Sequence, residues 1–310
     1  MSEKRKTLVR IWSGTPVHQS IDTRQHMALV EKIQAKLEEK ADAIYEGDFS
    51  VIEVFKDKKA LVTHQARGGY RYPFTPAQTD IEAIIMDMHD GKLPSGIKLY
   101  VTAHKHTVAG SMEYHGIKIL RCPAFVGFIP YAGSLTMLPH YLSDIGAWII
   151  IITKDGRIKL QEWLYPSCLY NEDKDELIMG DKSEKSYVDT KQKTIEEPLI
   201  SLLKEASKVI LVLADLHIGE LSAVCSESFE DGNGIIRKNK LTKANEKLLY
   251  YWKHLCYMTK TYFKPDEIWL VGDVFSGQMT VRFEKTRRMT ISNIDDQTYT
   301  ALELIKQLIQ

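Results

Sequence analysis

The feature of this sequence that most constrains its fold is an alternation of short apolar runs with longer amphipathic stretches. The short runs are rich in β-branched and aromatic residues, which favour strands, and the longer stretches repeat their apolar residues with the period of a helix. We predict strands at residues 7–12, 50–55, 60–63, 97–102, 117–120, 147–153, 158–163, 209–214 and 267–271. We predict helices at residues 23–39, 76–89, 198–206, 242–260 and 295–309. This alternation indicates an α/β fold in which helices cover sheets.

One polar segment divides the chain. Residues 171–197 (NEDKDELIMGDKSEKSYVDTKQKTIEE) are rich in both charge signs, which is typical of a solvated, flexible connection. We therefore expect the boundary between two packed halves, residues 1–170 and 198–310, to lie there.

The composition excludes several classes of protein. Lys plus Arg and Asp plus Glu both total 41, so no global field attracts nucleic acid, and any contact with a polyanion must be local. The longest apolar run, residues 145–153 (IGAWIIIIT), is far shorter than the roughly 20 residues of a membrane span. The N-terminus lacks a signal-peptide pattern, and the cysteines form no CxxC pair. We expect a cytoplasmic protein with reduced thiols that makes no membrane contact.

Carboxylates follow two of the predicted strands at the points where these strands end. One strand runs into Asp215 and His217 in the sequence LADLH, and another runs into Gly272 and Asp273 in the sequence LVGD. Because α/β folds gather their functional loops at the carboxyl ends of strands, we expect these side chains to lie in one site.

Histidines follow three further predicted strands. The sequence YVTAHKH ends in His104 and His106, whose alternation would turn both side chains toward one cleft. The sequence VTHQARGG carries His64 before a Gly-containing loop, and IWSGTPVH carries His18 after a glycine turn. Oxygen and imidazole ligands suit Mn²⁺, Fe and Zn²⁺, and a carboxylate can bridge two such ions. The combination of motifs favours a metal centre over core packing.

In this combination the chain resembles the calcineurin-like metallophosphoesterases, whose motifs run DxH, GD, GNH, a lone His and GHxH. Here the order is GTPVH, His64, AHKH, DLH and GD, which is the family order started in the middle. Reading from residue 209 to residue 310 and then on from residue 1 restores it. The chain therefore resembles a circular permutant, a rearrangement that is tolerated when the old termini lie close together at the surface. Met179, inside the polar segment, is a candidate for the former initiator residue.

The resemblance implies a single domain over residues 1–310, an α/β fold of two face-to-face mixed β-sheets flanked by helices in a four-layer sandwich. Residues 1–170 would supply the family's C-terminal half, residues 198–310 its N-terminal half, and residues 171–197 the linker. The implied function is metal-dependent hydrolysis of a phosphoester, and of a phosphodiester in particular, by a two-metal-bound hydroxide. The implied cofactors are two divalent metal ions, Mn²⁺ in the first place, with Fe or Zn²⁺ as alternatives.

The resemblance also assigns roles to the motif residues. Asp215, His217 and His106 would hold the first metal, Asp273 would bridge the two, and His64 with His104 would hold the second. His18 would act as a general acid or oxyanion stabiliser, or as a ligand.

The third motif departs from the family pattern, because GTPVHQ stands where GNHD is usual. Thr15 replaces the metal-binding Asn, and His18 lies two residues further along. Either His18 moves in as a ligand of the second metal, or that metal is bound more weakly. The variant with GT and a displaced histidine resembles a branch of phage and prokaryotic phosphoesterases, some of them related to nucleases.

Three residues are candidates for contact with the substrate. Arg71 and Arg282 could grip a phosphate bidentately, and Thr15 would lie beside the metals. Tyr70 and Tyr72 flank Arg71 and could stack on a base, so nucleic acid is one candidate substrate. The alternative for these basic runs is an ordinary solvated surface.

Two other functions are weighed against phosphodiester hydrolysis. One is phosphomonoesterase activity on a small metabolite, and the other is a non-catalytic binding scaffold of the same fold. Scaffold members of the family usually lose several ligands, whereas here only the Asn position is lost. The long polar segment permits both a closed monomer and a homodimer that exchanges its halves.

Overall fold

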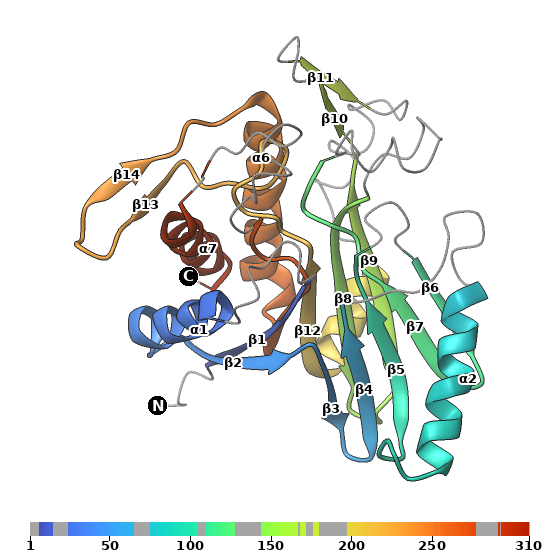
Figure 1. The fold of residues 1–310 in the computed structure, drawn as a ribbon. Coiled ribbons are helices and arrows are strands. Elements are labelled where there is room, and N and C mark those ends of the chain that lie inside the picture. The colour runs from blue at the N-terminus through green and yellow to red at the C-terminus, as the bar shows by residue number, and fades with distance from the viewer. Residues whose placement is uncertain are drawn as a thin grey trace.

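The computed structural model describes residues 6–14, 24–64, 75–104, 110–127, 144–166, 168–171, 176–179, 197–276, 291 and 293–309. For residues 75–76, 168–171 and 176–179 it describes the backbone alone. Helices separate groups of strands along these residues, and most of the strands form two large sheets (Figure 1).

The first sheet has six strands and mixes the two halves of the chain. Its order is β2 (Ala41–Gly47), β1 (Thr7–Trp12), β15 (Glu267–Val271), β12 (Ala206–Ala214), β8 (Ile145–Thr153) and β9 (Ile158–Tyr165). The first four strands are parallel, and β8 and β9 are antiparallel to their neighbours. The central strands β15 and β12 come from the second half of the sequence, with strands of the first half on both sides. Neither half can therefore form this sheet alone.

The second sheet has five strands, all from the first half. Its order is β3 (Phe49–Phe55), β4 (Lys58–Thr63), β5 (Ile97–Thr102), β7 (Ile117–Arg121) and β6 (Gly110–Tyr114). Strands β4, β5 and β7 are parallel, and the two edge strands are antiparallel to them.

Three buried clusters of apolar side chains show how these layers pack. One cluster lies between the sheets and includes Val62, Val101, Ile150, Val212 and Trp269. A second joins the other face of the six-stranded sheet to α1 (Arg24–Leu37), α5 (Glu197–Lys204), α6 (Lys243–Met258) and α7 (Ile294–Ile309). A third joins the five-stranded sheet to α2 (Thr75–His89). The predicted α/β fold with two multi-stranded sheets and helices is confirmed (Figure 1).

A ladder of alternating charges lies on the inner face of the six-stranded sheet, where β15 begins. The carboxylate of Glu267 lies 2.5 Å from Lys208 Nζ on β12 and 3.0 Å from Arg10 Nε on β1. Arg10 also pairs with Glu46 on β2, and Trp269 Nε1 donates to Glu267 at 2.8 Å. Burial alone would raise the pKa of Glu267, but these cations and hydrogen bonds outweigh it and lower that pKa. The ladder supplies its own counter-charges across four neighbouring strands.

Several elements were not predicted. They are β2, β6, and two hairpins made of β13 (Ser228–Glu230) with β14 (Ile236–Lys238) and β10 (Cys168–Asn171) with β11 (Glu176–Met179). The second hairpin corrects the prediction that residues 171–197 are connection throughout. The short apolar sequences CLYN and ELIM pair as strands there, and Met179 is the last residue of β11. Helix 242–260 ends earlier than predicted and continues as a π-helix, η1 (Thr259–Phe263).

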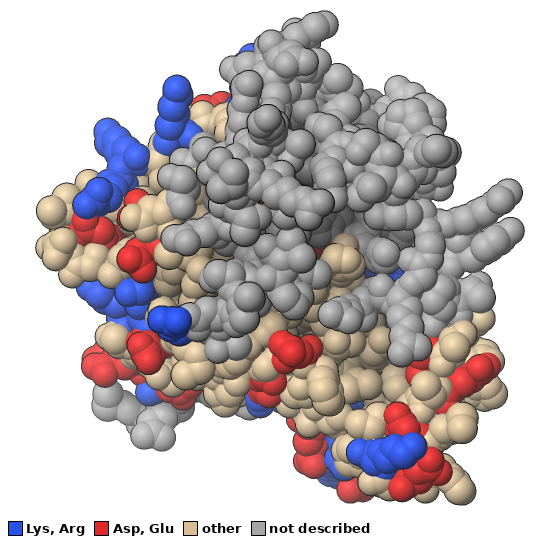
Figure 2. Space-filling view, viewed as in Figure 1, with Lys and Arg blue, Asp and Glu red and all other residues tan. Residues whose placement is uncertain are grey.

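Figure 2 shows that acidic and basic side chains are interspersed among the described residues of the face in view. Lys and Arg gather over the β13–β14 hairpin, where Arg237, Lys238 and Lys240 are exposed. None of the helices in the described ranges combines the length and apolarity that crossing a membrane requires.

Candidate metal centre

The first group of candidate ligands follows the two central strands of the six-stranded sheet. Asp215 comes directly after β12, and Asp273 follows Gly272 after β15. Asp215 and His217 have left-handed backbone conformations, with φ of 48° and 46°. Residues other than glycine rarely adopt this region. Backbone conformations of this kind carry local strain, and such strain is often found at functional sites.

Gly272 is required by the close packing of this turn. A Cβ atom built on it would collide with His64 Cδ2 and lie 2.6 Å from Asp215 Oδ1, and its φ is 97°. Any side chain here would displace two candidate ligands. Steric crowding therefore explains why the first position of the GD motif is a glycine.

The second group follows two strands of the five-stranded sheet. His64 comes directly after β4, and His104 follows Ala103 after β5. The predicted strand alternation of His104 and His106 is wrong at His104, because β5 has ended and His104 has a φ of 75°. Its backbone N–H instead donates to Asp215 Oδ2 at 2.8 Å, which bends the chain toward the facing sheet.

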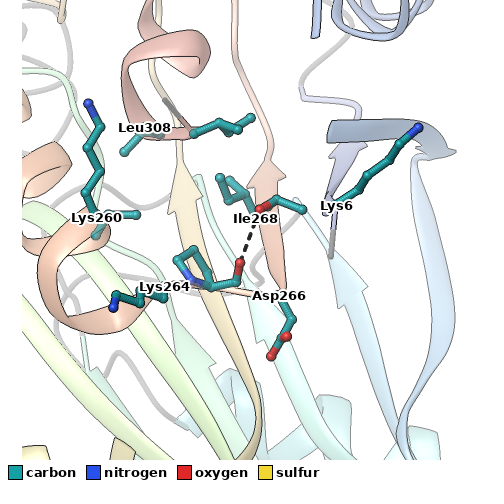
Figure 3. A pocket seen from close by; sticks show the side chains of 10 residues that line it. Lys6, Lys260, Lys264, Asp266, Ile268 and Leu308 are labelled. Carbon is teal, nitrogen blue, oxygen red and sulfur yellow. Dashed lines mark hydrogen bonds between the residues drawn. The ribbon is translucent and has the colours of Figure 1, made fainter. Parts of the chain in front are cut away.

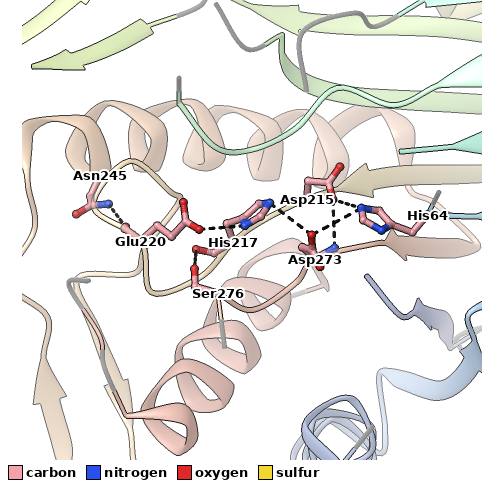
Figure 4. A network of polar contacts seen from close by, with 7 residues as sticks. All are labelled: His64, Asp215, His217, Glu220, Asn245, Asp273 and Ser276. Carbon is pink, nitrogen blue, oxygen red and sulfur yellow. Dashed lines mark hydrogen bonds and ion pairs between the residues drawn. The ribbon is translucent and has the colours of Figure 1, made fainter. Parts of the chain in front are cut away.

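The Asp215 carboxylate connects the loops of both sheets. Its Oδ1 lies 2.9 Å from His64 Nε2 and accepts from the Asp273 backbone N–H at 3.1 Å. The Asp273 carboxylate lies 3.8 Å from His64 Nε2 and 3.9 Å from His217 Nε2 (Figure 4). The rings of His64 and His104 meet edge to face, with centroids 4.8 Å apart.

The donor atoms form two groups that share one residue. The atoms of Asp215, His217 and Asp273 lie within 4.8 Å of one another, and so do those of His64, His104 and Asp273. Carboxylate oxygens and imidazole nitrogens at such spacing can hold a divalent cation. Asp273 alone is common to both groups.

The charges of this cluster favour a cation. Burial lowers the pKa of His217, but Glu220, Asp273 and Asp215 outweigh it, and the pKa is raised. Burial also lowers the pKa of His64, and Asp215 and Asp273 reverse that effect in the same way. Carboxylates buried this deeply stabilise any positive charge placed among them, whether a proton or a metal ion. The donor set therefore fits divalent metal.

Five of the predicted site residues, Thr15, His18, Arg71, His106 and Arg282, lie outside the described residues. The structure does describe Gly14, the first residue of the third motif. A Cβ atom on Gly14 would collide with Asp273 Oδ1, so the GTPVH sequence begins against the candidate centre.

One residue of the site was missed. Glu220 is 5% exposed, and its Oε1 lies 3.2 Å from His217 Nδ1. The only sequence signal is its spacing of three residues from His217 in DLHIGE, which has no meaning without the left-handed turn at His217.

These features define a buried cluster of histidines and carboxylates that could hold a metal ion. No family model and no curated protein matches the chain. Two solved structures are similar over part of it. A single mutant of Vps29 from Entamoeba histolytica is 14% identical, with a TM-score of 0.24, and the match covers 51% of this chain and 98% of that one. Vacuolar protein sorting 29 from Cryptosporidium parvum is 10% identical, with a TM-score of 0.24, and the match covers 52% and 97%. At these TM-scores the chemistry of the site rests on its own residues.

Proposed function

We propose that this protein hydrolyses a phosphoester, and specifically a phosphodiester, at a two-metal centre. The observation that carries the proposal is that Asp273 belongs to both groups of donor atoms, one from each side of the interface between the sheets. A shared carboxylate flanked by two such groups is an arrangement that suits a pair of metal ions.

The residues divide between the two positions as follows. Asp215 and His217, with His106, would hold one ion, and His64 with His104 would hold the other, while Asp273 would serve both. When bound, divalent cations at such a centre lower the pKa of a water molecule and stabilise charge on the phosphoryl oxygens. His18 would donate a proton to the leaving group or stabilise the phosphoryl oxygens, or complete the second position.

We also propose that the fold is a circularly permuted metallophosphoesterase sandwich, with residues 1–310 as one domain. Strands β15 and β1 are adjacent and parallel, and α7 follows β15 on the helical face of the sheet. Leu308 and Ile309 at the end of α7 line the same pocket of about 400 Å³ as Lys6 and Thr7 at the start of β1 (Figure 3). A short join would turn β15, α7 and β1 into an ordinary β–α–β unit.

Metal content and turnover test the function together. The protein would be incubated with Mn²⁺, freed of excess metal and subjected to elemental analysis, with Zn²⁺ and Fe²⁺ in parallel. We expect about two ions per chain and hydrolysis of a bis-aryl phosphodiester. A panel of single-stranded DNA, duplex DNA, RNA, cyclic nucleotides and an aryl phosphomonoester then identifies the substrate class. Metal binding without turnover on any of these would favour the binding scaffold, and absence of metal binding would contradict the proposal.

A further inference from the structure

The imidazole of His217 lies between two carboxylates. Its Nε2 faces Asp273 Oδ2 at 3.9 Å, and its Nδ1 faces Glu220 Oε1 at 3.2 Å (Figure 4). The side chains of His217 and Glu220 are 1% and 6% exposed, so water contributes little to this contact. Glu220 belongs to neither group of candidate ligands in the described residues.

The backbone of His217 is fixed independently of its ring. Its N–H donates to the Asp273 carbonyl at 2.8 Å, and its own carbonyl accepts from Ser276 Oγ at 2.7 Å. These two bonds fix the backbone but not the orientation of the imidazole. Glu220 contacts the ring itself, at the nitrogen that points away from Asp273.

Glu220 is in turn held by the first turn of α6. Asn245 Nδ2 donates to the Glu220 carbonyl at 3.2 Å and to the Ala223 carbonyl at 2.7 Å. Asn245 also forms a capping box with Thr242, and Thr242 Oγ1 donates to the Leu221 carbonyl at 2.6 Å. A helix start that is doubly capped is a rigid support, so the backbone that carries the Glu220 side chain is held in place beside the ring.

We propose that Glu220 is a positioning residue that accepts the Nδ1 proton of His217 and so leaves the Nε2 lone pair facing Asp273, where a divalent cation would bind. A neutral imidazole carries one proton, and a hydrogen bond at one nitrogen decides which nitrogen is free to ligate. Carboxylates that act in this way also fix the ring orientation. The inference rests on the proposed metal centre, since it assigns Glu220 a role only toward a bound ion.

The test compares Glu220→Gln with Glu267→Gln, a matched change of a buried carboxylate in the charge ladder. Mn²⁺ dissociation constants would be measured by competition with a metal indicator, and unfolding by thermal midpoint. We expect Glu220→Gln to weaken Mn²⁺ binding about 10- to 100-fold, and Glu267→Gln to leave it unchanged. An unchanged dissociation constant in Glu220→Gln would overturn the inference.

A spectroscopic measurement on the wild-type chain covers the case in which Glu220→Gln does not fold. Histidine-selective ¹⁵N labelling of the Zn²⁺-loaded protein reports the protonated nitrogen of each ring. We expect His217 to carry its proton on Nδ1 and to bind Zn²⁺ through Nε2, and the reverse assignment would overturn the inference. If the wild-type chain binds neither Mn²⁺ nor Zn²⁺, the proposed function itself fails. If the wild-type chain binds metal and Glu220→Gln binds it equally well, the proposed role of Glu220 fails while the proposed metal centre stands.

Discussion

Two polar clusters lie at opposite ends of strand β15, and they differ in how their charge is balanced. In the ladder, Glu267 lies between Lys208 and Arg10, and its pKa is lowered. In the candidate centre, Asp215 and Asp273 lie against His64 and His217, and the pKa values of these histidines are raised.

The difference indicates which cluster is structural. Permanent cations complete the ladder, so it needs nothing from solution. Histidines are neutral at ordinary pH unless carboxylates hold a proton on them, so a bound external cation would improve the charge balance of the centre. Both clusters are polar and buried. Their carboxylates differ in the positive partner, which is a lysine or an arginine in the ladder and a histidine in the candidate centre.

Asp273→Asn is the change that should affect the centre most. The amide keeps the size of the side chain but removes the charge that both groups of donors share. We expect phosphodiester turnover to fall by more than about 1,000-fold, since several kcal/mol of transition-state stabilisation depends on the metals. Elemental analysis should show loss of metal from both positions. Near-normal turnover would rule out the two-metal assignment.

His26 isolates the effect of burial on the pKa of a histidine, the effect that carboxylates outweigh at His64 and His217. This residue of α1 is fully buried between the rings of Tyr45 and Phe275, and burial lowers its pKa to about 4. The unfolded chain takes up this proton near pH 6.5, so stability should fall as the pH drops from 6.5 toward 4 and then level off. His26→Phe should remove about 3 kcal/mol of this dependence.

The measurement is urea unfolding over a pH series, with the wild-type chain and His26→Phe compared at each pH. Identical slopes in the two proteins would contradict the burial argument for this histidine. They would also weaken the contrast between His26 and the site histidines.

Glu267→Gln tests the ladder. The substitution removes the carboxylate that pairs with both Lys208 and Arg10, which are 19% and 18% exposed. We expect the free energy of unfolding at pH 7 to fall by about 2 kcal/mol, less than for a fully buried pair. Because the folded pKa of Glu267 is lowered, its contribution is present above its unfolded pKa of about 4.3 and is lost as the pH falls through the folded value. A difference between variant and wild type that persists in strong acid would argue against this account.

Rejoining the chain should have the smallest effect. A permuted protein with residues 180–310 followed by residues 1–179 keeps the β10–β11 hairpin intact and joins the ends that share the pocket of Figure 3. We expect its free energy of unfolding to lie within about 1 kcal/mol of the wild-type value, with metal content retained.

Separate halves are the contrasting case for the same prediction. Residues 1–179 lack the centre of the six-stranded sheet, and residues 180–310 lack its flanks. We expect each half alone to aggregate or to be partly ordered, as unpaired edges and an apolar face are exposed. A permuted protein that is insoluble or binds no metal would count against circular permutation.

The sequence predicts the buried strands best. Strands β1, β5 and β15 lie at the predicted residues, every position of β15 is buried, and the apolar run of residues 268–271 marks that strand. Strand β2 was missed because its core-facing residues are the small Ala41 and Ala43, while Ile44 is 43% exposed. Its apolar pattern is thus weaker on the buried face than on the exposed one. Strand β14 is a similar case, because its apolar residue Ile236 is 72% exposed and no apolar side chain of the strand marks a buried face.

The sequence also places candidate ligands at strand ends, because that rule depends only on where apolar runs stop. It does not predict the backbone after those ends. Asp215, His217 and His104 all have positive φ, a conformation that is uncommon outside glycine and that tertiary hydrogen bonds stabilise here. The contact between His217 and Glu220 depends on one of these turns, so no pattern in DLHIGE could have revealed it.

The interleaved sheet has a consequence for synthesis on the ribosome. Thr7 at the start of β1 bonds to Pro265 just before β15, across 258 positions of sequence. At roughly 5–20 residues per second, β1 would wait on the order of 10–50 s for its central neighbour to be made. During this interval β8 also lacks β12, and the apolar faces of both strands are uncovered. We expect the nascent chain to depend on chaperone binding until β15 emerges, more than a chain that begins at β12 would.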